Sequence, residues 1–218
     1  MAIEKTYIYD ENSDTALAKL VDFLAKKAVP DYFSKVENEN GIVSCYTEND
    51  SPIMTIEFPM NTKGVTIYTK NGTSLNINTG NNNYSKFGYG YALKNGLALQ
   101  IAPATATFPF ALAVTKDDEK NTVIIAENRF IPAISPNTIS PIYIINFNSD
   151  TIEQLKVIRY SCSNFEKTAL VPFVVLGSKG NYTPNAFLQI FRHNSEQGTL
   201  EIDGVKYFSN GLWCIKDE

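Results

Sequence analysis

Residue types that bind metals or catalyse reactions are scarce in this chain. Its 218 residues include one histidine, His193, and three cysteines, Cys45, Cys162 and Cys214. Zinc sites usually need several converging His or Cys ligands, and these four residues lack the short spacings typical of such sites. An odd number of widely separated cysteines is typical of reduced thiols rather than a disulfide framework. We therefore expect no metal, no cofactor and no catalytic residue, and we interpret Cys45 and Cys214 as small buried hydrophobic residues.

Clusters of positive charge are also missing. The chain has 19 Lys and Arg residues against 23 Asp and Glu residues, a net charge of −4, and the basic residues do not gather along any segment. A nucleic-acid-binding surface needs a concentrated basic patch that displaces counterions from phosphates. We therefore expect no nucleic-acid partner.

Signals for secretion or membrane insertion are not evident. The N-terminal MAIEKTYIYDENSD has no apolar run and no small-residue cleavage site, so we do not expect a signal peptide. The stretch from Leu97 to Val114 carries no charge and is about as long as a membrane span, but Pro103 and Pro109 would break a helix twice. It predicts two strands joined by a loop, and no membrane partner.

Short patterns typical of β-strands dominate what is present. Hydrophobic residues make up 44% of the chain and aromatic residues 12%, which is enough to bury a core. Apolar residues alternate with polar ones between tight-turn signals such as Asn71-Gly72 and Asn95-Gly96. The predicted strands are 42–47, 53–58, 64–70, 73–78, 86–93, 97–102, 110–116, 121–127, 142–147, 170–177, 185–192, 198–202, 205–208 and 212–216, while 152–160 is compatible with helix or strand.

This spacing predicts a mainly β fold, an antiparallel β-sandwich or open barrel built of hairpins. We expect a single domain over residues 1–218, with loops near 81–85 or 132–141 as the alternative boundaries between two lobes.

One N-terminal segment has helical periodicity and is expected to pack on a sheet. In SDTALAKLVDFLAKKAVP, residues 13–30, apolar side chains recur at spacings of three and four, while most lysines lie opposite. Ser13 or Asp14 is placed to cap this helix, and Pro30 to end it.

Asp10, Asn12 and Asp14 imitate the start of a calcium-binding loop. An EF-hand in that frame needs glycine at position 15 and a carboxylate at position 21, where the chain has Thr15 and Val21. Helix capping is therefore the better interpretation.

Other motifs are incomplete. His193 lies beside Ser195, but no elbow glycines frame a nucleophile there, so a solvated loop histidine is favoured. Neither the pair Gly88 and Gly90 nor the pair Gly177 and Gly180 completes a phosphate-binding loop, and all four are interpreted as strand or turn glycines.

The most unusual candidate surface is KFGYGYAL, residues 86–93. Strand alternation places Phe87, Tyr89 and Tyr91 on one face and Gly88 and Gly90 on the other. The aromatic row is suited to stacking a sugar ring or a partner protein. The alternative, which is favoured, has the aromatic rings in the core and the glycines under a packed neighbour.

The C-terminal residues predict a three-stranded meander. Asp203-Gly204 and Asn210-Gly211 are both hairpin signals. The only tryptophan, Trp213, is expected to anchor the last strand to the core, with contact to a partner as the alternative. A last strand can also be a sheet edge, which here would be protected only by the charged residues 216–218.

The C-terminal NYTPNAFLQIFRHNSEQGTLEIDGVKYFSNGLWCIKDE, residues 181–218, resembles the end of virion structural proteins encoded by phages and prophages of Gram-positive gut bacteria. The shared pattern is a turn, a polar loop and a charged end, and it contains Tyr182, Pro184, Asn185, Ala186, Gly204, Tyr207, Asn210-Gly211 and Trp213. A weaker likeness covers the N-terminal helix and residues 110–126.

The resemblance implies a non-enzymatic subunit of the head decoration, neck, tail or baseplate, made in the host cytoplasm and incorporated into the virion. It implies other virion proteins and copies of the same chain as partners, and no catalytic residues. Phe87, Tyr89, Tyr91 and Trp213 are the candidate interaction surface. The first alternative is a β-sandwich module that binds a glycan or receptor, and the second is a hydrolase acting through scattered carboxylates.

Overall fold

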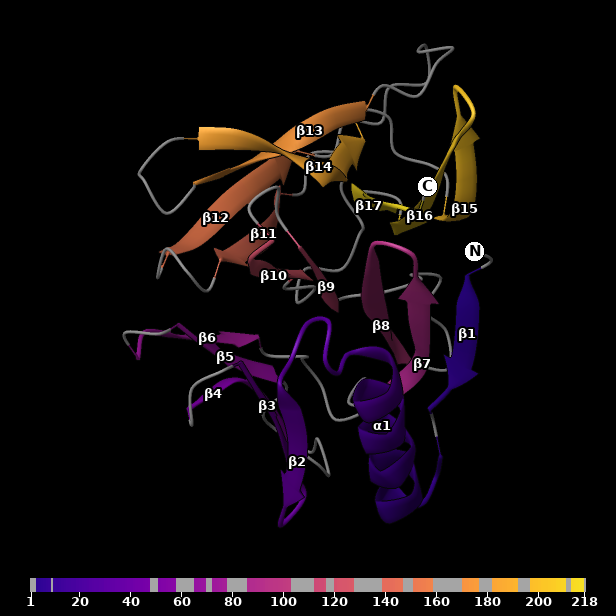
Figure 1. Ribbon diagram of the computed structural model, residues 1–218, viewed down its shortest axis with the longest axis vertical. Helices are drawn as coiled ribbons and strands as arrows, with labels where there is room; N and C mark the ends of the chain where they lie inside the picture. The colour runs from indigo at the N-terminus through magenta and orange to yellow at the C-terminus, as the bar shows by residue number, and fades with distance from the viewer. Residues whose placement is uncertain are drawn as a thin grey trace.

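The fold is that of a computed structural model. The structure describes residues 3–8, 10–47, 51–57, 65–69, 72–77, 86–102, 112–116, 120–127, 139–146, 151–158, 170–176, 182–191, 197–210 and 213–217. These residues contain one α-helix and seventeen β-strands, and the strands form three antiparallel sheets (Figure 1). The predicted mainly β class with a single N-terminal helix is confirmed.

The largest sheet, sheet A, has seven strands in the order β1-β7-β8-β9-β10-β11-β12. The strands are β1 (Glu4–Tyr7), β7 (Lys86–Leu93), β8 (Gly96–Ala102), β9 (Leu112–Lys116), β10 (Thr122–Glu127), β11 (Ile139–Asn146) and β12 (Thr151–Ile158). The two ends of the charge-free stretch 97–114 lie in β8 and β9, which pair with each other, as the two prolines predicted. The ambiguous segment 152–160 forms β12, a strand.

Sheet B has the order β2-β3-β4-β5-β6, and sheet C the order β13-β14-β17-β16-β15. The strands of sheet B are β2 (Lys35–Glu39), β3 (Ile42–Tyr46), β4 (Pro52–Glu57), β5 (Val65–Tyr68) and β6 (Ser74–Ile77). Those of sheet C are β13 (Leu170–Leu176), β14 (Tyr182–Phe191), β15 (Gln197–Ile202), β16 (Val205–Asn210) and β17 (Trp213–Lys216).

Helix α1 (Ser13–Lys27) buries one side in a core that it shares with sheets A and B. Leu20 and Leu24 are fully buried, and Phe23 is 2% exposed. The helix contacts β2 and β7. Figure 1 shows sheet C at the opposite end of the molecule from α1 and sheet B, with the strands of sheet A between them. The predicted helix therefore packs on a sheet, as its one-sided periodicity indicated.

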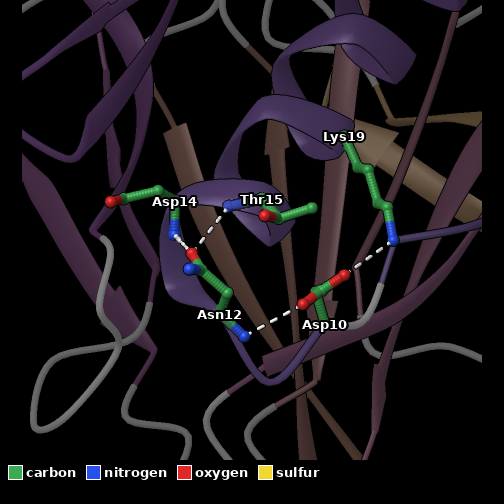
Figure 2. Close-up of polar contacts among 5 residues, drawn as sticks. All are labelled: Asp10, Asn12, Asp14, Thr15 and Lys19. Carbon is green, nitrogen blue, oxygen red and sulfur yellow. Dashed lines mark hydrogen bonds and ion pairs between the residues drawn. The ribbon is translucent and has the colours of Figure 1, made fainter.

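The helix cap differs from the prediction. The N-cap residue is Asn12, not Ser13 or Asp14 (Figure 2). The Asn12 side-chain oxygen accepts hydrogen bonds from the backbone N–H groups of Asp14, at 2.9 Å, and Thr15, at 3.2 Å. Asp10 stabilises the turn before the helix, because its carboxylate accepts from the Asn12 N–H and pairs with Lys19 Nζ at 3.0 Å. The side-chain oxygens of Asn12 and Asp10, two of the three residues that resembled a calcium loop, are thus used in capping and ion pairing.

Replacing Asn12 by alanine is expected to lower the free energy of unfolding by about 1 kcal/mol, because two N–H groups of the first turn lose their acceptor. Asn12→Ser, which retains a capping oxygen, and Ser13→Ala are expected to change it by less than about 0.5 kcal/mol. Chemical denaturation measures all three variants. A larger loss in Ser13→Ala than in Asn12→Ala would show that the cap is assigned to the wrong residue.

The C-terminal strand is central rather than an edge. The predicted meander is present, with β15, β16 and β17 paired in sequence and a positive φ at both Asp203 and Gly204 in the first turn. However, β17 also pairs with β14, so it lies inside sheet C, whose edges are β13 and β15. The alternative that this strand is an edge protected only by terminal charges is therefore wrong.

Asp217 shows why those charges do not act as edge protection. Its side chain is 1% exposed, and its carboxylate accepts a hydrogen bond from the Lys94 N–H at 3.0 Å. The Lys216 carbonyl accepts another from Asn95 Nδ2 at 3.0 Å. These hydrogen bonds hold residues 216 and 217 against the turn between β7 and β8, and so join sheet C to sheet A.

Candidate interaction surface

One face of β1 and β7 carries a row of aromatic side chains. The two strands pair antiparallel with Lys5 opposite Tyr91 and Tyr7 opposite Tyr89, so these four side chains share a face of sheet A. The ring centroids of Tyr7 and Tyr89 are 5.1 Å apart, those of Tyr89 and Tyr91 6.2 Å, and those of Tyr91 and Phe208 of β16 4.6 Å. We call Tyr7, Tyr89, Tyr91 and Phe208 the aromatic row.

The aromatic row leads from the surface into the core. Tyr7 is 53% exposed, Tyr89 is half-buried, and Tyr91 and Phe208 are 6% and 4% exposed. The Tyr91 hydroxyl donates to Gln100 Oε1 at 2.8 Å. Burial, with a smaller contribution from Tyr89, raises the pKa of Tyr91 to about 12. Only the outer end of the row, at Tyr7 and Tyr89, is therefore accessible to a partner.

Lysines flank this outer end. Lys5 Nζ lies 3.7 Å from the centroid of the Tyr89 ring, a cation–π contact, and Lys19 Nζ lies 5.6 Å from the centroid of Tyr7. Lys19 also pairs with Asp10. Within the described part of the chain, the salt bridges do not include Lys5. The surface therefore combines an exposed tyrosine with a cation that lies on a neighbouring ring.

The glycine face of β7 lies under the helix. Thr6 is opposite Gly90, and both are on the face that packs against α1. A Cβ atom built on Gly90 would lie 2.6 Å from Phe23 Cζ, so only a residue without a side chain fits beneath that ring. The glycine face of β7 is thus covered by helix α1 of the same chain.

The remaining predicted residues are only partly described. Phe87 lies in β7 opposite Ile101, and Trp213 lies in β17 opposite Ile190, but their side chains are outside the described residues. The proposed surface roles of these two residues therefore remain predictions. The same is true of the motifs at 177–180 and 193–195 and of the lobe boundary at 81–85, which lie outside the described residues. Of the other boundary, 132–141, only residues 139–141 are described, and they lie in β11.

Cys45 is fully buried in sheet B, and burial raises the pKa of its thiol, as expected of a small core residue. Cys162 and the side chain of Cys214 lie outside the described residues. Over the described ranges there is no group of three or more His, Cys, Asp or Glu residues that could hold a metal ion. In the same part of the chain, no helix is long and apolar enough to span a membrane.

Sequence reasoning missed the strand that completes the surface. No strand was predicted at β1, although Thr6 and Ile8 alternate with Lys5 and Tyr7 in a period of two. Phe208 was placed in a predicted strand but was not linked to Tyr91, because their contact joins two sheets. The alternation in KTYI was the signal that could have revealed Tyr7 and Lys5.

Comparisons with known proteins do not add a relative. No protein-family model matches the chain, and no significant match was found among curated proteins or among solved structures. The aromatic row and the edge strand that carries its outer end are therefore the features of the described residues that bear on function.

Proposed function

We propose that this protein is a non-enzymatic structural subunit of a phage-type virion, a component of the head decoration, neck, tail or baseplate. It acts through contacts with other virion proteins and with copies of itself. The observation that carries the proposal is the position of Tyr7 and Lys5 on β1, an edge strand of sheet A. Tyrosine is enriched in protein interfaces, and an edge strand can add a strand from another chain.

The resemblance of residues 181–218 supports the same class of protein. These residues include β14, β15, β16 and β17, which are four of the five strands of sheet C. Two of the shared positions are explained by the fold: Gly204 has a positive φ of 78° in the turn between β15 and β16, and Tyr207 is 9% exposed in β16. The resemblance thus concerns residues that build a stable scaffold, as a subunit assembled in many copies requires.

The proposal predicts that the protein is present in purified particles. Virions from a host strain that carries the gene are purified by density gradient and analysed by quantitative mass spectrometry. We expect the chain at a fixed ratio to the major capsid protein, in the same gradient fraction. A host protein of similar abundance serves as the control for contamination. Absence from the particles would contradict the proposal.

A second candidate function is binding of a glycan at the outer end of the aromatic row. The observation that favours it is the exposure of the Tyr7 ring, 53%, beside Tyr89. Lys5 covers one face of the Tyr89 ring, and the Tyr91 ring is buried. Tyr7 is therefore the ring on which a sugar would stack. A glycan array with wild type, Tyr7→Ala and the control Tyr46→Ala separates the two candidates. Glycan binding that is lost only in Tyr7→Ala would favour this second function.

A further inference from the structure

The backbone of β1 has a defined outward side. The N–H of Ile8 donates to the carbonyl of Gly88 at 2.9 Å, and Ile8 and Gly88 follow the same register as Thr6 opposite Gly90 and Glu4 opposite Ala92. Antiparallel pairs alternate between hydrogen-bonded and non-hydrogen-bonded positions. The backbone groups of Glu4 and Thr6 therefore point toward β7, whereas those of Lys5 and Tyr7 point away from the sheet.

The geometry points to pairing of β1 with β1 of a second copy of this chain, antiparallel, about a two-fold axis at Thr6. This inference rests on the proposed function and names the self-contact that it uses. In an added antiparallel strand, outward-pointing residues must face outward-pointing residues, because they exchange the backbone hydrogen bonds. Lys5 and Tyr7 can then face only Lys5 and Tyr7 of the partner subunit or residues an even number of positions away.

Charge and the bounds of β1 select one register. An axis at Tyr7 would pair Lys5 with residue 9, which lies beyond the end of the strand at Tyr7. An axis at Lys5 would place two lysine side chains directly opposite each other, which is destabilising. An axis at Thr6 places Lys5 opposite the partner's Tyr7 and Thr6 opposite the partner's Thr6. Cation–aromatic and Thr–Thr cross-strand pairs are both favourable. The two-fold axis gives two equivalent contacts between Lys5 of one copy and Tyr7 of the other. The aromatic rows of the two copies then meet at their outer ends.

The charges on β1 favour pairing with another strand more than those on β2, an edge strand of sheet B. The carboxylate of Glu4 is paired with Lys27 Nζ at 2.7 Å, so Lys5 is the one charged side chain of β1 that has no ion pair among the described residues. By contrast, the edge strand β2 of sheet B has the sequence KVENE, with exposed Lys35, Glu37 and Glu39. Alternating charges of this kind protect an edge from pairing.

Cross-linking tests the register. In the proposed dimer the two Thr6 residues form a non-hydrogen-bonded pair, with Cα atoms about 4.5 Å apart, within the range for a disulfide. Thr6→Cys is therefore expected to give a disulfide-linked dimer on mild oxidation, seen on a non-reducing gel. Lys5→Cys is the matched control, because its two copies would be diagonal, about 7–8 Å apart, and are expected to cross-link poorly. Wild type shows the background from the three native cysteines.

Removal of a backbone donor tests the pairing itself. Lys5→Pro deletes an N–H that points away from β7, and proline is tolerated at such edge positions. We expect it to convert the dimer to a monomer, measured by analytical ultracentrifugation, with an unchanged circular dichroism spectrum. Lys5→Thr keeps the N–H and is expected to retain a weaker dimer. A dimer that persists in folded Lys5→Pro would overturn the inference, and if that variant does not fold, the cysteine pair still decides the matter.

The outcomes separate this inference from the proposed function. A wild-type protein that is monomeric at all concentrations but present in virions would overturn the self-pairing and leave the virion role standing. If Lys5→Pro then lowered incorporation into virions, the strand that pairs with β1 would come from a different virion protein. A Thr6-linked dimer that is absent from virions would support the self-pairing and contradict the virion role. Stronger cross-linking of Lys5→Cys than of Thr6→Cys would overturn the proposed register.

Discussion

Deletion of residues 212–218 is expected to unfold sheet C and leave the protein aggregated or lower its thermal midpoint by more than about 10 °C. These seven residues include β17, which lies between β14 and β16, so deletion leaves two strands without their shared neighbour. It also removes Ile215, which is fully buried, and truncation of one such side chain typically costs about 2–5 kcal/mol. Differential scanning fluorimetry and size-exclusion chromatography measure the result. Unchanged thermal stability and oligomeric state would contradict the central position of β17.

A matched pair of variants isolates the contact at the end of the chain. Asp217→Ala removes the acceptor for the Lys94 N–H and is expected to lower the free energy of unfolding by about 1–3 kcal/mol, because a partly buried donor loses its partner. Asp217→Asn keeps a side-chain oxygen in the same place and is expected to cost less. Equal losses in the two variants would show that the charge matters and not the hydrogen bond.

Adding a side chain at Gly90 is expected to destabilise the contact between helix α1 and sheet A. The Cβ atom of Gly90→Ala would lie 2.6–2.8 Å from three atoms of the Phe23 ring, which is 2% exposed and has little room to move. Overpacking of this kind typically costs about 1–3 kcal/mol, and we expect a larger loss for Gly90→Val than for Gly90→Ala. Chemical denaturation of both variants measures the loss.

The double variant Gly90→Ala with Phe23→Leu is the control for this mechanism. Leucine lacks the ring atoms that the new methyl group would meet, so the loss from the two changes together should be smaller than the sum of the separate losses. Strictly additive losses would show that Gly90 is required for another reason, such as its backbone conformation.

Several elements could be predicted from the sequence because their signals are local. The KFGYGYAL strand has the predicted bounds 86–93, and the Asp203-Gly204 turn has the positive φ values that such residues permit. Helix α1 was predicted from spacings of three and four, although its cap was placed one or two residues too late. The cap was misplaced because Asn12, Ser13 and Asp14 are all good capping residues, and only the backbone conformation selects one.

Strand β2 was missed because its own hydrophobic pattern is weak. KVENE in β2 contains only one apolar residue, Val36, so it has little period-two hydrophobicity. It forms a strand because the turn at Asn40 and Gly41 brings it against β3. Pairing with a neighbour, rather than its own pattern, decides its structure.

The mainly β class, the single amphipathic helix and most of the strand positions follow from the sequence alone, because periodicity and turn residues act over a few neighbouring positions. Which strands are edges and which faces are buried depends instead on tertiary contacts. The contacts that set these features join Gly90 to Phe23, Tyr91 to Phe208 and Lys94 to Asp217, and these residues are far apart in the chain. An alternating strand has the same local pattern at the centre of a sheet or at its edge. Its role depends on what packs beside it, which no local pattern records.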